Sequence, residues 1–132
     1  MTPLNYTVAM KKVNLAEKFA LIERPWNPRV AGEINECYVK LVKLAGEFVW
    51  HKHDAEDELF LVIKGRLRMK VREAGREHEI EINPGEFLVV PHGTEHLPIA
   101  DENTEVVLLE PKATLNTGDK RNERTVEELE WI

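Results

Sequence analysis

Three of the five histidines in this chain form a pattern with one glutamate that is suited to holding a metal ion. His51 and His53 are separated by one residue, Glu58 follows shortly after them, and His96 lies further along the chain. Imidazole nitrogens and carboxylate oxygens bind borderline divalent metals, and the lack of thiolate disfavours soft metals and iron–sulfur clusters. The set therefore predicts one divalent transition metal per chain, with Fe, Mn, Ni, Zn or Cu as candidates. Four protein ligands around an octahedral ion leave positions open, which is typical of sites that bind ligands or do chemistry.

The spacing of these residues indicates how the chain could bring them together. In a strand over residues 51–53 both imidazoles point to the same side, because alternate side chains share a face. A polar turn follows, so Glu58 would open the next strand beside the two histidines, and a tight turn at 91–95 would return the chain at His96. Glu56 is the alternative carboxylate if the second strand begins earlier, although the acidic residues of the turn are expected to be solvated.

Short runs of strand-forming residues, separated by glycine and proline turns, fill the middle of the chain. Strands this short at this spacing predict a sandwich or a closed barrel, and no stretch from 37 to 110 shows a helical period. We expect strands over residues 37–44, 48–53, 59–63, 67–72, 78–82, 87–90 and 106–109. Tyr38, Phe60 and Met69 are candidate pocket walls.

The chain divides into three predicted parts: an N-terminal extension (1–36), a barrel (37–110) and a polar C-terminal tail (111–132). In the extension, residues 19–22 are a candidate edge strand. In the tail, residues 126–132 could form one short helix, with Thr125 as its N-cap.

Composition limits the functional classes. The chain has 132 residues and a net charge of −6, which fits one soluble domain and argues against a nucleic-acid partner. The basic residues between 66 and 72 alternate with apolar ones, which is typical of the wet face of one strand. Cys37 is the single cysteine, so no internal disulfide is possible and a reducing, cytoplasmic location is expected. We expect neither a signal peptide nor a membrane-spanning segment.

Two runs, residues 59–63 and 87–90, are apolar on both faces. One face of an antiparallel sheet normally meets water, so these strands need a second cover. The N-terminal segment or the tail could provide it, but we favour a second copy of the chain and predict a homodimer.

The segment from Gly46 to Ala100 resembles the cupin superfamily through both of its signature motifs. The first motif consists of Gly46, His51-Lys52-His53, Glu58 and Gly65, and the second of Gly85, Pro91-His92-Gly93 and His96. Gly46 lies one residue closer to His51 than usual, and Ala100 replaces an asparagine that often closes the second motif. Neither position is a ligand in the family. The resemblance implies that His51, His53, Glu58 and His96 bind a metal inside an all-β, double-stranded β-helix (jelly-roll) barrel.

The chain, including the tail segment 115–119, is similar to small stand-alone prokaryotic cupins commonly labelled mannose-6-phosphate isomerase-like. That label reflects fold similarity and is a weak guide to reaction. We therefore expect a metal-dependent enzyme acting on a small organic molecule, of oxygenase or isomerase type, with no catalytic residue assigned beyond the ligands. The alternative is a non-enzymatic cupin that binds or senses a small molecule.

Overall fold

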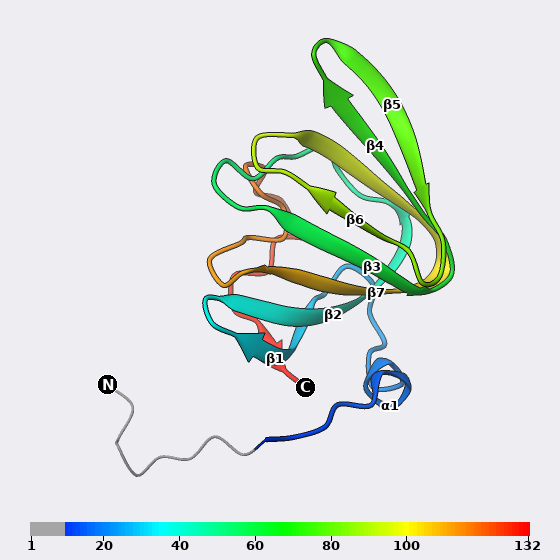
Figure 1. Ribbon diagram of the computed structural model, residues 1–132, viewed down its shortest axis with the longest axis vertical. Coiled ribbons are helices and arrows are strands. Elements are labelled where there is room, and N and C mark those ends of the chain that lie inside the picture. Colours follow the sequence, from blue (N-terminus) through cyan, green and yellow to red (C-terminus); the bar gives the residue numbers. More distant parts are fainter. Residues whose placement is uncertain (1–9) are drawn as a thin grey trace.

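The computed structural model describes residues 10–132, and this part of the chain forms an all-β jelly roll with one short helix (Figure 1). The predicted fold class is confirmed, although the sheet is not closed. The elements are α1 (Leu15–Phe19), β1 (Arg29–Ile34), β2 (Cys37–Glu47), β3 (Glu58–Lys64), β4 (Leu67–Glu73), β5 (Arg76–Ile82), β6 (Phe87–Val90), β7 (Glu95–Pro111) and β8 (Glu130–Trp131). Residues 1–9, which belong to the predicted N-terminal extension, lie outside the described residues.

The long strand β7 organises the sheet. Along one edge it pairs antiparallel with β4 through residues 95–100 and then with β3 through residues 105–109. Along the other edge it pairs with β2 from residue 99 to residue 111. The sheet continues from β2 to β1 and β8 on one side and from β4 to β5 on the other, while β6 pairs with β3 (Figure 1). One strand therefore connects both halves of the roll and passes the predicted metal ligands.

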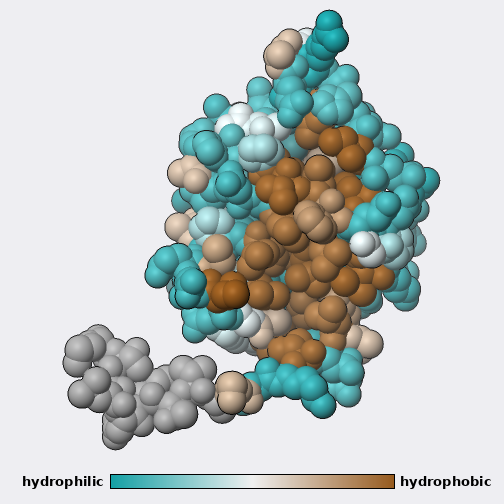
Figure 2. All heavy atoms as spheres, viewed as in Figure 1, coloured by the Kyte–Doolittle hydropathy of each residue, from teal (hydrophilic) through white to brown (hydrophobic). Residues whose placement is uncertain are grey.

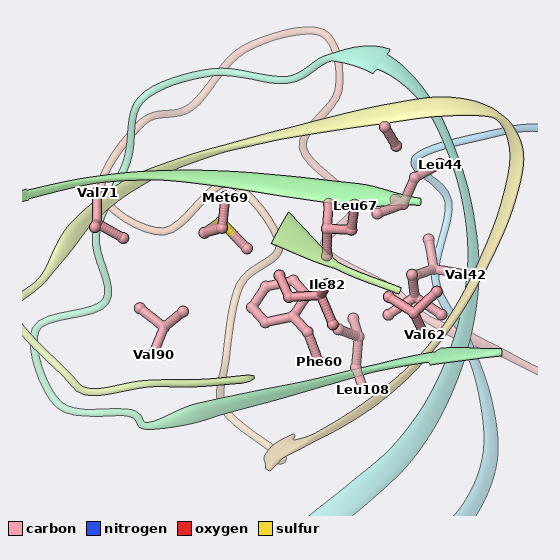
Figure 3. Close-up of a cluster of buried hydrophobic side chains, with 12 residues drawn as sticks. Val42, Leu44, Phe60, Val62, Leu67, Met69, Val71, Ile82, Val90 and Leu108 are labelled. Carbon is pink, nitrogen blue, oxygen red and sulfur yellow. The ribbon is translucent and has the colours of Figure 1, made fainter. Parts of the chain in front are cut away.

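The core lies on the inner face of the roll, as the alternation of apolar residues predicts. In β4, Leu67, Met69 and Val71 are buried, while the basic residues between them face outward. Val62 and Phe60 of β3 lie in the same cluster (Figure 3). Burying a side chain of this size contributes roughly 1.5–3 kcal/mol to folding, so the packing of these apolar side chains is a main source of stability for the strands.

Gly65 allows the tight turn from β3 to β4. Its φ is +86°, and a Cβ at this position would collide with Thr104 of β7. The Thr104 hydroxyl accepts a hydrogen bond from the Arg66 backbone N–H and donates to the carbonyl of Asp101 at 2.7 Å. Because only glycine fits this left-handed position against a neighbouring strand, Gly65 lets the turn from β3 to β4 pack closely on β7.

The structure corrects three local predictions. Residues 48–53 form no regular strand, and only His51 makes an isolated bridge. Residues 19–22 are not a strand. Phe19 ends the short helix α1 and residues 20–22 follow it; the N-cap side chain of this helix, Asn14, accepts a hydrogen bond from the Glu17 N–H. Phe19 and Ile22 are instead buried against the outer side of β2.

The helix predicted at 126–132 is also wrong. Glu130 and Trp131 form β8, parallel to β1, and the Ile132 N–H donates to the Val30 carbonyl at 2.9 Å. The edge of the sheet offers this segment backbone partners, whereas an isolated helix of seven residues is too short to be stable in water. The division of the chain at residues 36 and 110 stays a prediction. No helix among residues 10–132 is long and apolar enough to cross a bilayer.

Candidate metal centre

The four predicted ligands meet inside the roll. His51, His53, Glu58 and His96 are buried, and each offers a nitrogen or oxygen that lies within 4.8 Å of those of the others. Glu56, the alternative carboxylate, is not part of the cluster. The convergence expected from the sequence is therefore present, and the cluster has the composition of a site that could hold a metal ion.

A backbone bridge brings two of the histidines together. The His51 N–H donates to the His96 carbonyl at 3.0 Å, and the His96 N–H donates to the His51 carbonyl at 2.9 Å. Their ring centroids lie 4.2 Å apart. The bridge joins His96 to His51 and not to His53. Glu58 comes from the first residue of β3, which is the neighbour of β7.

Backbone carbonyls fix the ring orientation of two ligands. Nδ1 of His51 lies 2.9 Å from the Val49 carbonyl, and Nδ1 of His96 lies 2.9 Å from the Thr94 carbonyl. A carbonyl only accepts, so each Nδ1 carries the hydrogen in the neutral ring and each Nε2 keeps its lone pair. This is the arrangement by which proteins commonly present imidazole to a metal.

The remaining polar atoms of the cluster are buried and short of partners. Within residues 10–132, both ring nitrogens of His53, Nε2 of His96 and Oε1 of Glu58 make no well-formed hydrogen bond. Oε1 of Glu58 is nevertheless 3.3 Å from Nε2 of His53 and 3.5 Å from Nε2 of His96. Unsatisfied buried polar atoms are costly, and so many in one place need an explanation. A cation among them would satisfy the lone pairs together, so the residues present fit a metal ion.

The electrostatics keep the ligands in states suited to a cation. Burial, and then the neighbouring His96, lower the pKa of His51 to about 4, so this ring is neutral at pH 7. Burial alone would raise the pKa of Glu58, but contacts with Glu110 and the histidines lower it well below its usual value. Burial opposes protonation of His53, yet the Glu58 carboxylate raises the pKa of that ring overall. At His53 a metal would therefore compete with a proton.

A buried ion pair lies behind the carboxylate ligand. Nζ of Lys40 is 2.7 Å from Oε1 of Glu110, and both side chains are almost fully buried. Burial and the charge of Glu58 raise the pKa of Glu110 well above its usual value. The sequence alone does not reveal this pair. Lys40 and Glu110 each interrupt an apolar run, but only the register of β2 on β7 places them diagonally on one face.

A pocket of about 420 Å³, counting its open mouth, adjoins the cluster. Trp26 and Phe48 form one wall, with parallel rings stacked at a centroid distance of 4.6 Å. Of the predicted pocket walls, Phe60 lines the pocket, whereas Tyr38 and Met69 do not. The lining is completed by Pro28, Val42, Leu44, His51, Glu58, Pro98, Leu108, Glu110 and Asn116. Trp26 lies in the predicted N-terminal extension, outside the predicted barrel, and no sequence motif marks it as part of a pocket.

The C-terminal tail covers one side of the site. Asn116 lines the pocket and also organises the tail, since it donates to the Arg124 carbonyl and accepts from the Val126 N–H, both at 2.8 Å. Asp119 accepts from the Lys52 N–H at 3.0 Å and its own N–H returns a bond to the Lys52 carbonyl. The polar composition of the tail thus reflects hydrogen bonds to the loop that carries His51 and His53.

Comparisons with known proteins agree with this architecture. A family model described as Cupin domain matches residues 38–111. The uncharacterized protein YdbB of Bacillus subtilis is 33% identical over 64 residues, which cover 48% of this chain and 54% of that protein. This chain therefore matches only about half the length of that curated relative.

Solved structures show the likeness over about three quarters of the chain. A cupin-2 domain containing protein from Shewanella frigidimarina is 41% identical with a TM-score of 0.71, covering 76% of this chain and 94% of the other. Protein NMB1881 from Neisseria meningitidis is 26% identical with a TM-score of 0.68, covering 77% of this chain and all of the other. With more than half of its residues matched by the family model, the chain belongs to the Cupin domain family.

Proposed function

We propose that His51, His53, Glu58 and His96 bind one divalent transition metal, and that the protein is a metal-dependent enzyme for a small organic molecule. The observation that carries the proposal is the set of buried ligand atoms without other partners, placed beside a pocket. When bound, such a metal supplies Lewis-acid or redox chemistry at its open positions. The reaction we propose is of oxygenase or isomerase type.

The protein's own residues prepare the site before any ligand arrives. The carbonyls of Val49 and Thr94 hold the rings of His51 and His96 in the tautomer that offers Nε2. The apolar side chains that line the pocket keep bulk water away, which strengthens electrostatic interactions inside it. Glu58 links the ligand cluster to the pocket, since it belongs to the cluster and also lines the pocket.

Elemental analysis of untagged protein, purified without chelators, tests the metal proposal. We expect about one transition metal ion per chain, and a loss of affinity of at least about a hundredfold in His96→Ala, since even outer-shell changes cost 10–100-fold. His78→Ala is the matched control, because His78 is an exposed histidine of β5. If wild-type protein dialysed against Fe, Mn, Ni, Zn and Cu salts retains none of them, the proposal is wrong.

One observation favours the alternative, a cupin that binds or senses a small molecule without turning it over. Among the described residues that line the pocket, the titratable ones are His51, Glu58 and Glu110, and each already belongs to the ligand cluster or to the pair with Lys40. An oxygen-uptake and isomerase screen of metal-loaded protein separates the two functions. Thermal shifts with ligand but without turnover would support the binding role.

The substrate class implied by the isomerase-like label receives little support. None of the described residues lining the pocket is a lysine or arginine, and phosphate groups are usually held by such side chains. The similarity to mannose-6-phosphate isomerase-like proteins stays a prediction. A cytoplasmic location also stays a proposal, supported by the single cysteine.

We further propose a homodimer that forms through the outer face of β3 and β6. Figure 2 shows a broad apolar area on this side of the molecule. Phe87 and Val89 are 63% and 44% exposed, and Leu59 and Leu61 beside them are half-buried. The helix α1 covers another part of the outer face, where Ile63 and Val107 pack near Phe19. The residues of α1 thus cover only a portion of the outer face, and a second copy would cover the apolar surface of β3 and β6.

A further inference from the structure

We propose that the pocket beside the metal centre takes a small aromatic molecule with a single hydroxyl group. The inference concerns the same site as the proposed metal-dependent function and rests on it. The aromatic side chains and the charged groups that line the pocket support it.

The wall offers flat aromatic surface held in a fixed position. Trp26 and Phe48 lie with their ring planes 17° apart. Nε1 of Trp26 donates to the Ala45 carbonyl at 2.9 Å, and its backbone N–H donates to the Lys43 carbonyl at 2.8 Å. Trp26 also has a φ of +62°, which is unusual for a bulky residue and is often found at functional sites. The structure thus holds a strained tryptophan where its ring can meet a planar ligand.

The lining of the pocket disfavours a phosphate group. Glu58 and Glu110 line it, and none of the described lining residues is cationic. Lys40 lies behind Glu110, with its Nζ 2.7 Å from Oε1 of that side chain. A phosphate ester would therefore place two negative charges beside carboxyl groups, with no side chain of the lining to pair them in a buried site.

The distribution of polar atoms limits the ligand to one polar end. His51, Glu58 and Glu110 lie in the part of the lining that adjoins the cluster, while Val42, Leu44 and the aromatic pair supply apolar surface. The Asn116 amide is engaged by the tail through both its oxygen and its nitrogen. A molecule with many hydroxyls, such as a sugar, would lose its hydrogen bonds to water without replacing them.

Phenol, cyclohexanol and glucose 6-phosphate are the probes for this proposal. Cyclohexanol keeps the hydroxyl but lacks the flat ring, and glucose 6-phosphate carries the excluded charge. The indole N–H resonances of Trp26, Trp50 and Trp131 in wild-type protein, assigned by single Trp→Phe variants, report on binding at each place. We expect phenol to shift the Trp26 resonance and leave the other two unchanged, with weaker binding of cyclohexanol and weakest binding of glucose 6-phosphate.

A pair of variants adds a second readout. Trp26→Leu should weaken phenol binding about tenfold, the loss of one aromatic contact. Trp50→Leu should leave it unchanged, because Trp50 is not part of the pocket and stacks under the Arg72 guanidinium at 3.8 Å. Tighter binding of glucose 6-phosphate than of phenol, or an unmoved Trp26 resonance in wild-type protein, would overturn the inference even if Trp26→Leu does not fold.

The titration is run on metal-free protein and on protein incubated with zinc, so that the two proposals fail separately. If zinc does not bind but phenol shifts Trp26, the metal centre is wrong and the aromatic pocket stands. If zinc binds but phenol leaves Trp26 unmoved, the metal centre stands and the ligand class is wrong.

Discussion

Gly118 of the tail lies directly against the carbonyl oxygen of Lys52, the residue between two of the predicted ligands. A Cβ at Gly118 would collide with this carbonyl and would come within 3.1 Å of Cδ2 of His51. The neighbouring residue Asp119 holds the same stretch through two hydrogen bonds with the Lys52 backbone. The position of the tail and the position of the His51 ring are therefore coupled.

Gly118→Ala is expected to destabilise the protein and to weaken metal binding. The φ of +56° strains any residue with a Cβ by roughly 1–2 kcal/mol, and overpacking against a backbone carbonyl adds about 1–3 kcal/mol. The measurements are urea unfolding and metal titration. Gly75→Ala is the control, because Gly75 has a φ of +74° and a Cβ there would meet no heavy atom within 4 Å, so this variant carries the strain without the collision. Equal losses in the two variants would show that the tail does not constrain the ligands.

A second prediction concerns the buried pair behind Glu58. Lys40→Met leaves Glu110 buried without its cation, which is expected to cost up to about 3–5 kcal/mol in unfolding free energy, and less at a pH where Glu110, whose pKa burial and Glu58 already raise, takes up a proton. The double variant Lys40→Met/Glu110→Gln removes the uncompensated carboxylate and should recover at least half of that loss. Urea unfolding of the four members of this cycle measures the coupling. Additive losses would mean that the two side chains do not act as a pair.

The sequence was most informative where chemistry and spacing acted together. His51, His53, Glu58 and His96 were identified as a group because imidazole and carboxylate in this pattern meet a chemical requirement. The strand over residues 67–72 followed from alternation, which depends only on which face is buried. Local patterns also located β3 and β6, but not β1 or the first part of β7.

The sequence was least informative where long-range pairing decides the outcome. Trp26 and Lys43 are distant in sequence, and the hydrogen bond between their backbones depends on the folded sheet. Lys40 and Glu110 become partners only through the register of β2 on β7. Residues 126–132 have a helix-like composition, but Glu130 and Trp131 pair with the open edge of β1 and form a strand. None of these outcomes is encoded by neighbouring residues alone.

A third prediction concerns pH and metal-free protein. Burial, followed by the charge of His96, lowers the pKa of His51 from 6.5 to about 4. The unfolded chain therefore takes up this proton first as the pH falls. The corresponding stability is fully present above pH 6.5 and is lost between pH 6.5 and 4, by roughly 3 kcal/mol.

Chelator-treated wild-type protein and His51→Gln, unfolded by urea at a series of pH values, test this linkage. The difference between the two curves should fall as the pH drops through that window. His53 contributes in the opposite sense, because the Glu58 carboxylate raises its pKa, so its stabilisation is present below pH 6.5 and is lost as the pH rises. The difference between wild type and His51→Gln reports mainly on His51, because His53 is present in both proteins. Parallel curves would contradict the assignment of a neutral buried ring to His51.

The last prediction concerns the outer face of β6. Val89→Lys places a charge on the exposed apolar surface beside Phe87, so we expect the proposed dimer to dissociate into 15.3 kDa chains. The reason is that a buried, unpaired ammonium at an interface costs more than the lost apolar contact. Sedimentation velocity at micromolar concentration measures the change. Glu79→Lys on β5 is the control, since it alters charge on an exposed strand away from β6. A monomeric wild-type protein would show that the apolar face is not a contact between copies, and an unchanged dimer in Val89→Lys would place the contact elsewhere.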